Sequence, residues 1–318
     1  MFKKLIVVLI VIILAGLAKQ PYEKRYAEEL TERHIMSPGL SLGVYNDLKQ
    51  SSFAGVLGGL RSVVATLTHL EAHGHFENQE WYDLKKAYQT CTSLDPHNLY
   101  YWQSGGWHLA YNAAADAKND RKLKSVQRRV MEKEFIEQGD EFLRQGAKAN
   151  PDDPDLWADL GRLWSSPFKI PDYRRSAEAW EKAVGLSENK VYRRSFIYSL
   201  ARVPEEEAKA LSYAREYVLD DRSQLDIPTF AAIYWALSHQ PGVPEKNRPQ
   251  LDEVFASPVV AYQHLHNYKL RAEKEQFPLW GVDEALREIL RTMEVPERFN
   301  SFTSENPQVI QGQGWNEE

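Results

Sequence analysis

Apolar residues recur every three or four positions along most of the chain, and this spacing predicts helices rather than strands. The clearest stretch has its apolar residues at Phe53, Val56, Leu57, Leu60, Val63, Val64, Leu67 and Leu70. Residues spaced in this way share one face of a helix, so we expect that face to pack inward. Gly74 follows the stretch and is the expected end of this helix.

Helical spacing returns in most of the later segments. The expected helices among them cover about residues 78–93, 229–239, 248–256, 259–274 and 281–293. No segment alternates apolar and polar residues between turn signals, as a half-buried strand would. The predicted fold class is therefore all-α.

Two junctions in the middle of the chain share one arrangement. In the first, Trp102 comes six residues after Pro96, and in the second, Trp157 comes six residues after Pro151. Self-similarity of this kind is the sequence signature of a stacked helical repeat.

A longer motif starts at the second of these tryptophans, with the form W-x2-L-G-x2-W followed by small-x3-aromatic-x2-small. Its residues are Trp157, Leu160, Gly161, Trp164, Ser176, Trp180 and Ala183. With this motif the chain resembles the tetratricopeptide repeat (TPR) family, whose pattern is W-x2-L-G-x2-Y, then A-x3-F, then P. The resemblance implies an α-solenoid of stacked antiparallel helix pairs, because one pair cannot bury its own apolar face. In such a pair, Gly161 would let the second helix approach closely, and Ala183 would keep the contact tight beneath Trp180.

The resemblance is strongest over about residues 77–187 and departs from the family elsewhere. Pro96 and Pro151 are 55 residues apart, against a family repeat of 34 residues. Gly105 stands in place of the motif's leucine, and Glu188 stands where the closing proline would be. Beyond residue 190 the motif is lost while helical signals persist. By continuation, we expect the repeat domain to cover residues 51–298.

The first nineteen residues predict where the chain resides. Residues 5–18 are uninterruptedly apolar, with Lys3 and Lys4 before them and Lys19 after them. As a helix they span about 21 Å, against a hydrocarbon core of roughly 30 Å. Two interpretations stay open: a membrane anchor in residues 1–19, which their density in Ile, Val and Leu favours, or a signal peptide cleaved after Ala18, which would make the protein secreted. In either case the leading lysines predict an extracytoplasmic main domain, periplasmic in a bacterium.

Composition narrows the function classes. Of 318 residues, 43% are hydrophobic and 26% are charged, and the net charge is −6, so a folded core is expected and nucleic-acid binding is not. The single cysteine, Cys91, excludes an intramolecular disulfide and a cysteine-based zinc site, and a buried core thiol is favoured over a nucleophile there.

Residues 20–50 read as a tether and a loop. The tail 299–318, rich in Asn, Gln, Ser and Gly, is expected to be disordered.

Enzymatic chemistry has one weak candidate in the sequence. His69, His73 and His75 lie close together, and the first two could share a helix face and bind a divalent metal ion. Their order, H-L-E-A-H, is not that of a zinc protease, and phosphate-loop and nucleophile-elbow motifs are missing from the sequence. We therefore expect no cofactor. A metal-dependent envelope enzyme using His69 and His73 is the alternative function.

The favoured functional site is the groove of the repeat. The resemblance implies that the first helix of each pair lines a concave face that binds ligands. Helical spacing predicts this face from Tyr100, Gln103, Trp107 and Tyr111, followed by Asp155, Ala158, Arg162 and Ser165. Whether the groove is open to a protein or peptide partner, or is covered by the chain's own segments such as the tail with Trp315, stays open. The predicted function is a membrane-tethered protein-interaction scaffold in an envelope assembly or transport complex.

Overall fold

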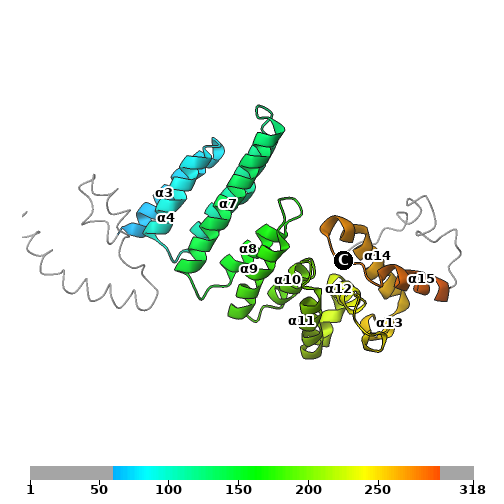
Figure 1. Cartoon of the computed structure of the whole chain (residues 1–318). Coiled ribbons are helices and arrows are strands. Elements are labelled where there is room, and N and C mark those ends of the chain that lie inside the picture. The colour runs from blue at the N-terminus through cyan, green and yellow to red at the C-terminus, as the bar shows by residue number, and fades with distance from the viewer. Residues whose placement is uncertain (1–59, 294–318) are drawn as a thin grey trace, which may run out of the picture. The chain divides into compact units, whose positions relative to one another are not determined.

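The computed structural model describes residues 60–293, and every regular element in that range is a helix (Figure 1). The predicted all-α class is confirmed for this range. The predicted anchor or signal segment, the tether of residues 20–50 and the tail 299–318 all lie outside it. Within residues 60–293, no helix combines the length and apolar character needed to cross a membrane. The chain divides into two compact units, one up to Asp159 and the other from Leu160 onward.

The first unit consists of helices that pack in sequence order. It contains α3 (Arg61–Glu77), α4 (Trp81–Leu94), α5 (Leu99–Trp107), the π-helical η2 (His108–Ala113), α6 (Ala114–Asn119), α7 (Ser125–Ala149) and the start of α8 (Asp155–Ser165). Helix α3 packs against α4, and the continuous stretch from α5 through η2 to α6 packs against α7. The long spacing between Pro96 and Pro151 is therefore taken up by longer helices.

The second unit is also helical in its described part. After the end of α8 it contains α9 (Tyr173–Leu186), α10 (Lys190–Leu200), α11 (Glu207–Asp220), the 3₁₀ turn η3 (Arg222–Asp226), α12 (Pro228–Ser238), the 3₁₀ turn η4 (Glu245–Asn247), α13 (Leu251–Val254), α14 (Pro258–Glu275) and α15 (Val282–Thr292). Each α-helix from α9 to α12 packs on the next, α12 packs on α14, and α14 packs on α15.

Local sequence explains where several helices begin. The side chains of Asp172, Asn189 and Ser257 accept hydrogen bonds from the first free backbone N–H groups of α9, α10 and α14. Pro228 and Pro258 stand at the starts of α12 and α14, where a missing N–H costs nothing. The predicted windows agree with α4, α12, α14 and α15. The window 248–256 was too long, because only Leu251–Val254 is helical there.

Glycines allow close approach at two helix contacts that the repeat pattern singles out. A Cβ at Gly146 on α7 would lie 2.7 Å from the indole of Trp102, and a Cβ at Gly161 on α8 would lie 2.5 Å from that of Trp180. Both distances are shorter than real Cβ contacts. A residue larger than glycine at either position would therefore collide with the indole ring. The predicted close approach of the second helix at Gly161 is confirmed, and the structure adds that Trp180 of α9 is the side chain in contact there.

The prediction for the first apolar stretch is wrong in two respects. Helix α3 does not end at Gly74 but continues to Glu77. Most apolar side chains of the stretch do not pack inward: Leu60, just before the helix, is 45% exposed, and Val63 is 51%, Leu67 60% and Leu70 63% exposed, whereas Val64 is half-buried. The predicted residues Phe53, Val56 and Leu57 lie outside the described range.

Small residues on the opposite face explain this outcome. Ala65 and Ala72 are the buried residues of α3, and the Sγ of Cys91 on α4 lies 3.3 Å from the carbonyl oxygen of Ala65. Alanine lets the two helices pack closely, so α3 contacts α4 through its small side chains and its bulky ones point away. The face of α3 that was expected to pack inward therefore points outward.

Candidate functional site

Two large aromatic rings of the predicted groove are exposed to solvent. Tyr100 and Trp107 lie on α5 and are 56% and 54% exposed. Trp107 stacks on Tyr111 of η2, with ring centroids 4.1 Å apart and planes inclined by 16°. The stacked pair therefore forms an ordered apolar surface at the point where the α-helix widens into a π-helical turn. Such turns are frequent at functional sites.

Gln103 has a structural partner rather than a free amide. Its Nε2 donates a hydrogen bond to Oδ2 of Asp159 on α8, over 2.9 Å. This bond ties α5 to α8, which are the first helices of two successive pairs in the predicted arrangement. Gln103 is thus placed at the predicted face, but part of its hydrogen-bonding capacity is already used.

The predicted residues on α8 have mixed outcomes. Asp155 and Arg162 are exposed and Ser165 is half-buried. Ala158 is fully buried, so its placement on the groove face was wrong. The Ser165 hydroxyl donates to the carbonyl oxygen of Arg162 over 3.2 Å, which fixes the end of the helix.

His69 lies among aromatic rings. Its imidazole centroid is 5.6 Å from that of Tyr88, 5.3 Å from that of Tyr100 and 5.6 Å from that of Tyr101. Burial lowers the pKa of His69, and the nearby imidazole of His73 lowers it further. His69 Nδ1 is buried without a hydrogen-bond partner. The ring therefore favours its neutral form and behaves as part of an aromatic cluster.

The histidines proposed as metal ligands have different partners. His73 Nε2 lies 3.4 Å from Glu77 Oε1, and His75 Nδ1 lies 2.6 Å from Glu80 Oε2. Within the described part of the chain, no group of three or more His, Cys, Asp or Glu side chains is arranged to hold a metal ion. The structure therefore does not bring the three histidines together as a ligand set.

Cys91 is a buried thiol, as predicted. Its exposed fraction is 0%, and burial raises its pKa to about 12. A nucleophilic or metal-binding cysteine needs the thiolate form, which this environment disfavours.

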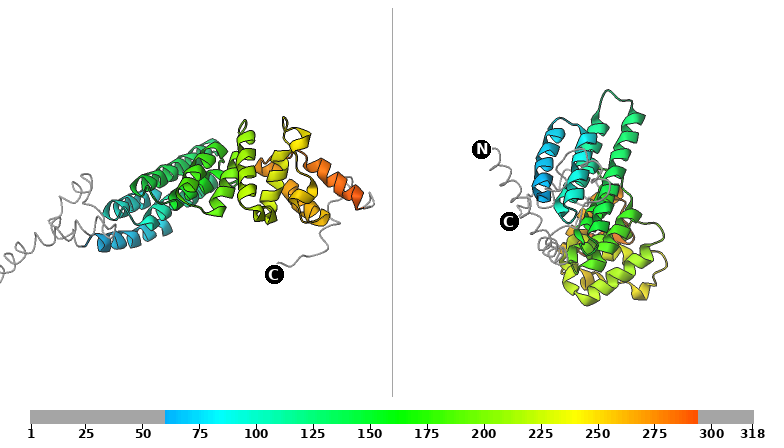
Figure 2. Two further views of the ribbon diagram at one scale, coloured as in Figure 1. Left: turned by 90° about the horizontal axis from the view of Figure 1, so that it is seen from below. Right: turned by 90° about the vertical axis from the view of Figure 1, so that its left-hand side faces the viewer.

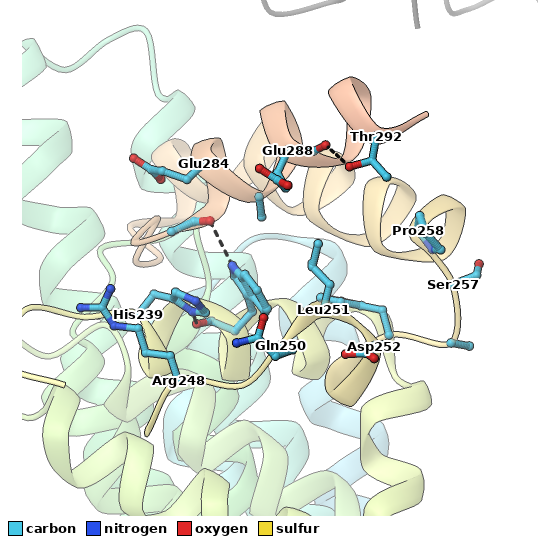
Figure 3. A pocket seen from close by; sticks show the side chains of 15 residues that line it. His239, Arg248, Gln250, Leu251, Asp252, Ser257, Pro258, Glu284, Glu288 and Thr292 are labelled. Atoms are coloured by element: carbon cyan, nitrogen blue, oxygen red, sulfur yellow. Dashed lines mark hydrogen bonds between the residues drawn. The ribbon is translucent and has the colours of Figure 1, made fainter. Parts of the chain in front are cut away.

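The sequence did not predict a pocket of about 890 Å³ in the second unit, which lies among the end of α12, the segment around α13, and α15 (Figure 3). Trp235 and His239 stack at its base with ring centroids 4.0 Å apart, and Trp235 Nε1 donates to the Gly281 carbonyl oxygen over 3.0 Å. Gly281 has φ +69°, and a Cβ there would meet the His239 ring at 2.7 Å, so glycine is required.

Charges of both signs surround this pocket. Glu284 and Glu288 project from α15, and Arg248 lies on the other side (Figure 3). The lining residues come from positions 235–292 in several separate segments. No local motif marks them, which is why sequence reasoning missed the pocket.

Comparisons with known proteins do not assign this chain to a family. The chain matches no protein-family profile, no curated protein and no solved structure. Function therefore has to be argued from the exposed rings of Tyr100 and Trp107, the pocket and the sequence patterns themselves.

Proposed function

We propose that this protein is a membrane-tethered, extracytoplasmic scaffold for protein–protein interaction, built as a TPR-like α-solenoid. The all-helical character of residues 60–293 and the packing of successive helices support the repeat architecture. The apolar run of residues 5–18, with lysines on both sides, supports the tether. An envelope assembly or transport complex is the setting that such a tethered scaffold fits.

One observation carries the binding role. The stacked rings of Trp107 and Tyr111, with Tyr100 on the same helical stretch, present aromatic surface to solvent although the fold buries most of its other large rings. We call these three residues the aromatic face. Tryptophan and tyrosine dominate the energetics of protein interfaces, because they bury a large area at a small cost in conformational entropy.

The chemistry around the aromatic face favours a protein partner. Asp155 on α8 is an exposed charge in the same unit as these rings, and polar side chains of this kind form the rim of many interfaces. An extended segment or a helix of the partner would cover the rings. The anchor would keep the resulting complex at the membrane.

The proposal is tested by comparing two surface substitutions in the full-length protein. Trp107→Ala combined with Tyr111→Ala removes the stacked pair of rings from the aromatic face. Tyr82→Ala, at a tyrosine on α4 that is 55% exposed, is the matched control. Proteins that copurify from the native membrane are quantified by mass spectrometry. We expect a discrete partner to be lost at least tenfold with the double variant and retained with the control.

Two results would contradict the binding role. One is an unchanged set of copurifying proteins in the double variant. The other is an equal loss in the Tyr82→Ala control, which would indicate a general effect of removing exposed aromatic rings.

A further inference from the structure

Basic side chains gather at the connection between α6 and α7 in the first unit. Residues 118–133 contain seven basic residues and two acidic ones, although the whole chain has a net charge of −6. We call residues 118–133 the basic tip. Figure 1 shows its loop at the upper end of the long helix α7, and the right-hand view of Figure 2 shows the same loop at the end of the hairpin that α6 and α7 form.

The two acidic residues of the basic tip have partners within it. Glu132 is 3% exposed, and its Oε1 lies 3.3 Å from Nζ of Lys118. Asp120 Oδ1 accepts a hydrogen bond from the backbone N–H of Lys122 over 2.8 Å, which fixes the turn before α7. The other exposed basic side chains are those of Arg121, Lys122, Lys124, Arg129 and Lys133. Their charges therefore face solvent.

Helix α7 begins well before its packed part. Its buried residues start at Glu132, and none of residues 125–131 is buried. At about 1.5 Å per residue, these seven residues cover about 10 Å of helix. The basic tip therefore projects from the packed part of the first unit.

Two valines on the projecting turns are exposed as well. Val126 is 73% exposed and Val130 is 60% exposed, and residues four positions apart lie on the same side of a helix. Leu123 and Met131 instead line a hollow beside Trp81, so these two apolar residues face the rest of the unit. The valines thus combine with the exposed cations into a surface of the kind found on helices that bind membrane interfaces.

We propose that the basic tip binds the surface of an anionic lipid bilayer. The exposed cations would contact the phosphate groups of the lipid headgroups. Val126 and Val130 would enter the boundary between the headgroups and the acyl chains. This role goes beyond the proposed scaffold, because it gives the first unit a membrane contact of its own in addition to the predicted anchor of residues 1–19.

Shape and composition favour a bilayer over other anionic partners. A small soluble anion needs a concave site, whereas the basic tip projects and meets an extended surface. A partner that offers phosphate groups alone would leave Val126 and Val130 in water. The projecting helix of about 10 Å also matches the depth of about 5–10 Å to which interfacial helices bury their apolar side. An acidic protein surface is the competing occupant, and the test below distinguishes it.

Electrostatic attraction supplies a measurable signature. Each basic side chain near an anionic membrane surface strengthens binding about fivefold. Salt weakens this attraction, because the Debye length falls from about 10 Å at 0.1 M to about 3 Å at 1 M ionic strength. Binding of the basic tip should therefore depend on the anionic lipid, on the cations and on salt together.

The full-length protein reconstituted in lipid vesicles provides the test. Val126→Cys carries an environment-sensitive fluorophore, and native Cys91 is buried and stays unlabelled. Leu219→Cys, at a leucine on α11 that is 86% exposed, is the control position. The vesicles consist of phosphatidylcholine alone or of phosphatidylcholine with phosphatidylglycerol, and both contain the same share of a lipid with a nitroxide on its headgroup. The nitroxide quenches only fluorophores at the bilayer surface, and comparing the two vesicle types cancels the contribution of residues 1–19.

We expect the fluorophore at position 126 to be quenched and blue-shifted in vesicles with phosphatidylglycerol and to be affected much less in phosphatidylcholine alone. Raising the ionic strength to about 1 M should reverse the effect. The fluorophore at position 219 should not distinguish the two vesicle types. Equal quenching at position 126 in both vesicle types, or none in either, would overturn the proposal.

Charge variants of the labelled protein assign the effect to the basic tip. Arg121→Gln combined with Lys122→Gln should lower the ratio of bound to free tip about twenty-fivefold. Lys246→Gln combined with Arg287→Gln removes the same charge from exposed residues of the second unit and should leave the ratio unchanged. Circular dichroism verifies the helical content of both. Equal losses in the two double variants would overturn the assignment to the basic tip.

An acidic polypeptide gives the remaining arm of the experiment. Polyglutamate is added to the protein labelled at position 126 in phosphatidylcholine vesicles. We expect any response to be smaller than that to phosphatidylglycerol, because polyglutamate offers the valines no apolar surface. A blue shift with polyglutamate and none with phosphatidylglycerol would identify an acidic protein surface as the occupant and overturn the bilayer.

This result is separable from that of the proposed function. The charge variants leave Trp107 and Tyr111 in place, and the double variant of the aromatic face leaves the basic tip intact. A basic tip that is not quenched, in a protein that still loses its partner when the two rings are removed, would overturn the membrane contact alone.

Discussion

Trp102 and Trp107 lie five residues apart on one short helix, yet their surroundings are opposite. Trp102 is 7% exposed, packs against Gly146 of α7, and donates its indole N–H to the Pro96 carbonyl oxygen over 2.8 Å. Trp107 is 54% exposed and stacks on Tyr111. The first indole has both a socket and a hydrogen-bond partner, whereas the second presents much of its surface to water.

The difference teaches that residue type alone does not decide which aromatic ring belongs to the core. A glycine on the neighbouring helix provides the space that an indole needs. The same reasoning applies to α3, where Ala65 faces α4 closely and Leu67 points to solvent. Side chains that face small residues on the next helix stabilise the fold, and large side chains without such a partner are available for binding.

The largest effect is expected when the socket of Trp102 is emptied. Trp102→Ala removes the ring and leaves a cavity beside Gly146, which should lower the free energy of unfolding by about 3–5 kcal/mol. Denaturant titration of the full-length protein, followed by circular dichroism, measures the change. A loss below about 1 kcal/mol would mean that Trp102 is not a core residue, and the contrast with Trp107 would fail.

A smaller loss is expected when the second socket is overfilled. Gly161→Ala places a methyl group against the ring of Trp180 and should lower the free energy of unfolding by about 1–3 kcal/mol. Gly185 on α9 is the matched control, because a Cβ there meets nothing within 4 Å. Gly185→Ala should be neutral or stabilising by up to about 1 kcal/mol, since alanine is the better helix former. Equal effects at the two glycines, in the same denaturant titration, would contradict the packing account.

The exposed tryptophan should matter little to stability. Trp107→Ala removes a ring that is half in solvent, so we expect the free energy of unfolding to change by less than about 1 kcal/mol. The same titration as for Trp102→Ala gives the value. A loss comparable with that of Trp102→Ala would place Trp107 in the core and weaken its assignment to a binding face.

The smallest effect concerns the pH dependence of stability at His69, whose side chain is half-buried. Burial lowers the pKa of His69 below its ordinary 6.5, so near that pH the unfolded chain binds this proton more readily than the folded chain. Its contribution to stability is fully present above pH 6.5 and declines as the pH falls below that value.

His69→Phe should therefore flatten the decline of stability between about pH 8 and pH 5, as measured by thermal unfolding across that range. An unchanged decline would show that His69 does not titrate as its aromatic surroundings require.

The sequence predicted the positions of the helices along the chain better than it predicted which face of a helix packs inward. The all-α class, the windows of α4 and α14, and the contact between Gly161 and Trp180 follow from local spacing and residue size. The outward direction of Val63, Leu67 and Leu70 on α3 does not, because only packing on α4 decides whether Ala65 or Leu67 faces inward.

The candidate site was predictable to a similar extent. Helical spacing placed Tyr100 and Trp107 on the face of their helix that Trp102 does not use, and the structure leaves both exposed. Burial of Ala158 depends on tertiary contacts that the sequence does not display. The pocket around Trp235 could not be found in advance, since its lining comes from segments up to 57 residues apart.

Photo-cross-linking from the aromatic face is the most direct test of the binding role. A photoreactive phenylalanine analogue replaces Trp107 in the full-length protein in its native membrane, and Tyr82 in the control. The account predicts cross-links from position 107 to one defined segment of one partner protein, and none to that segment from position 82. Cross-links from position 107 only to this chain's own residues would contradict it.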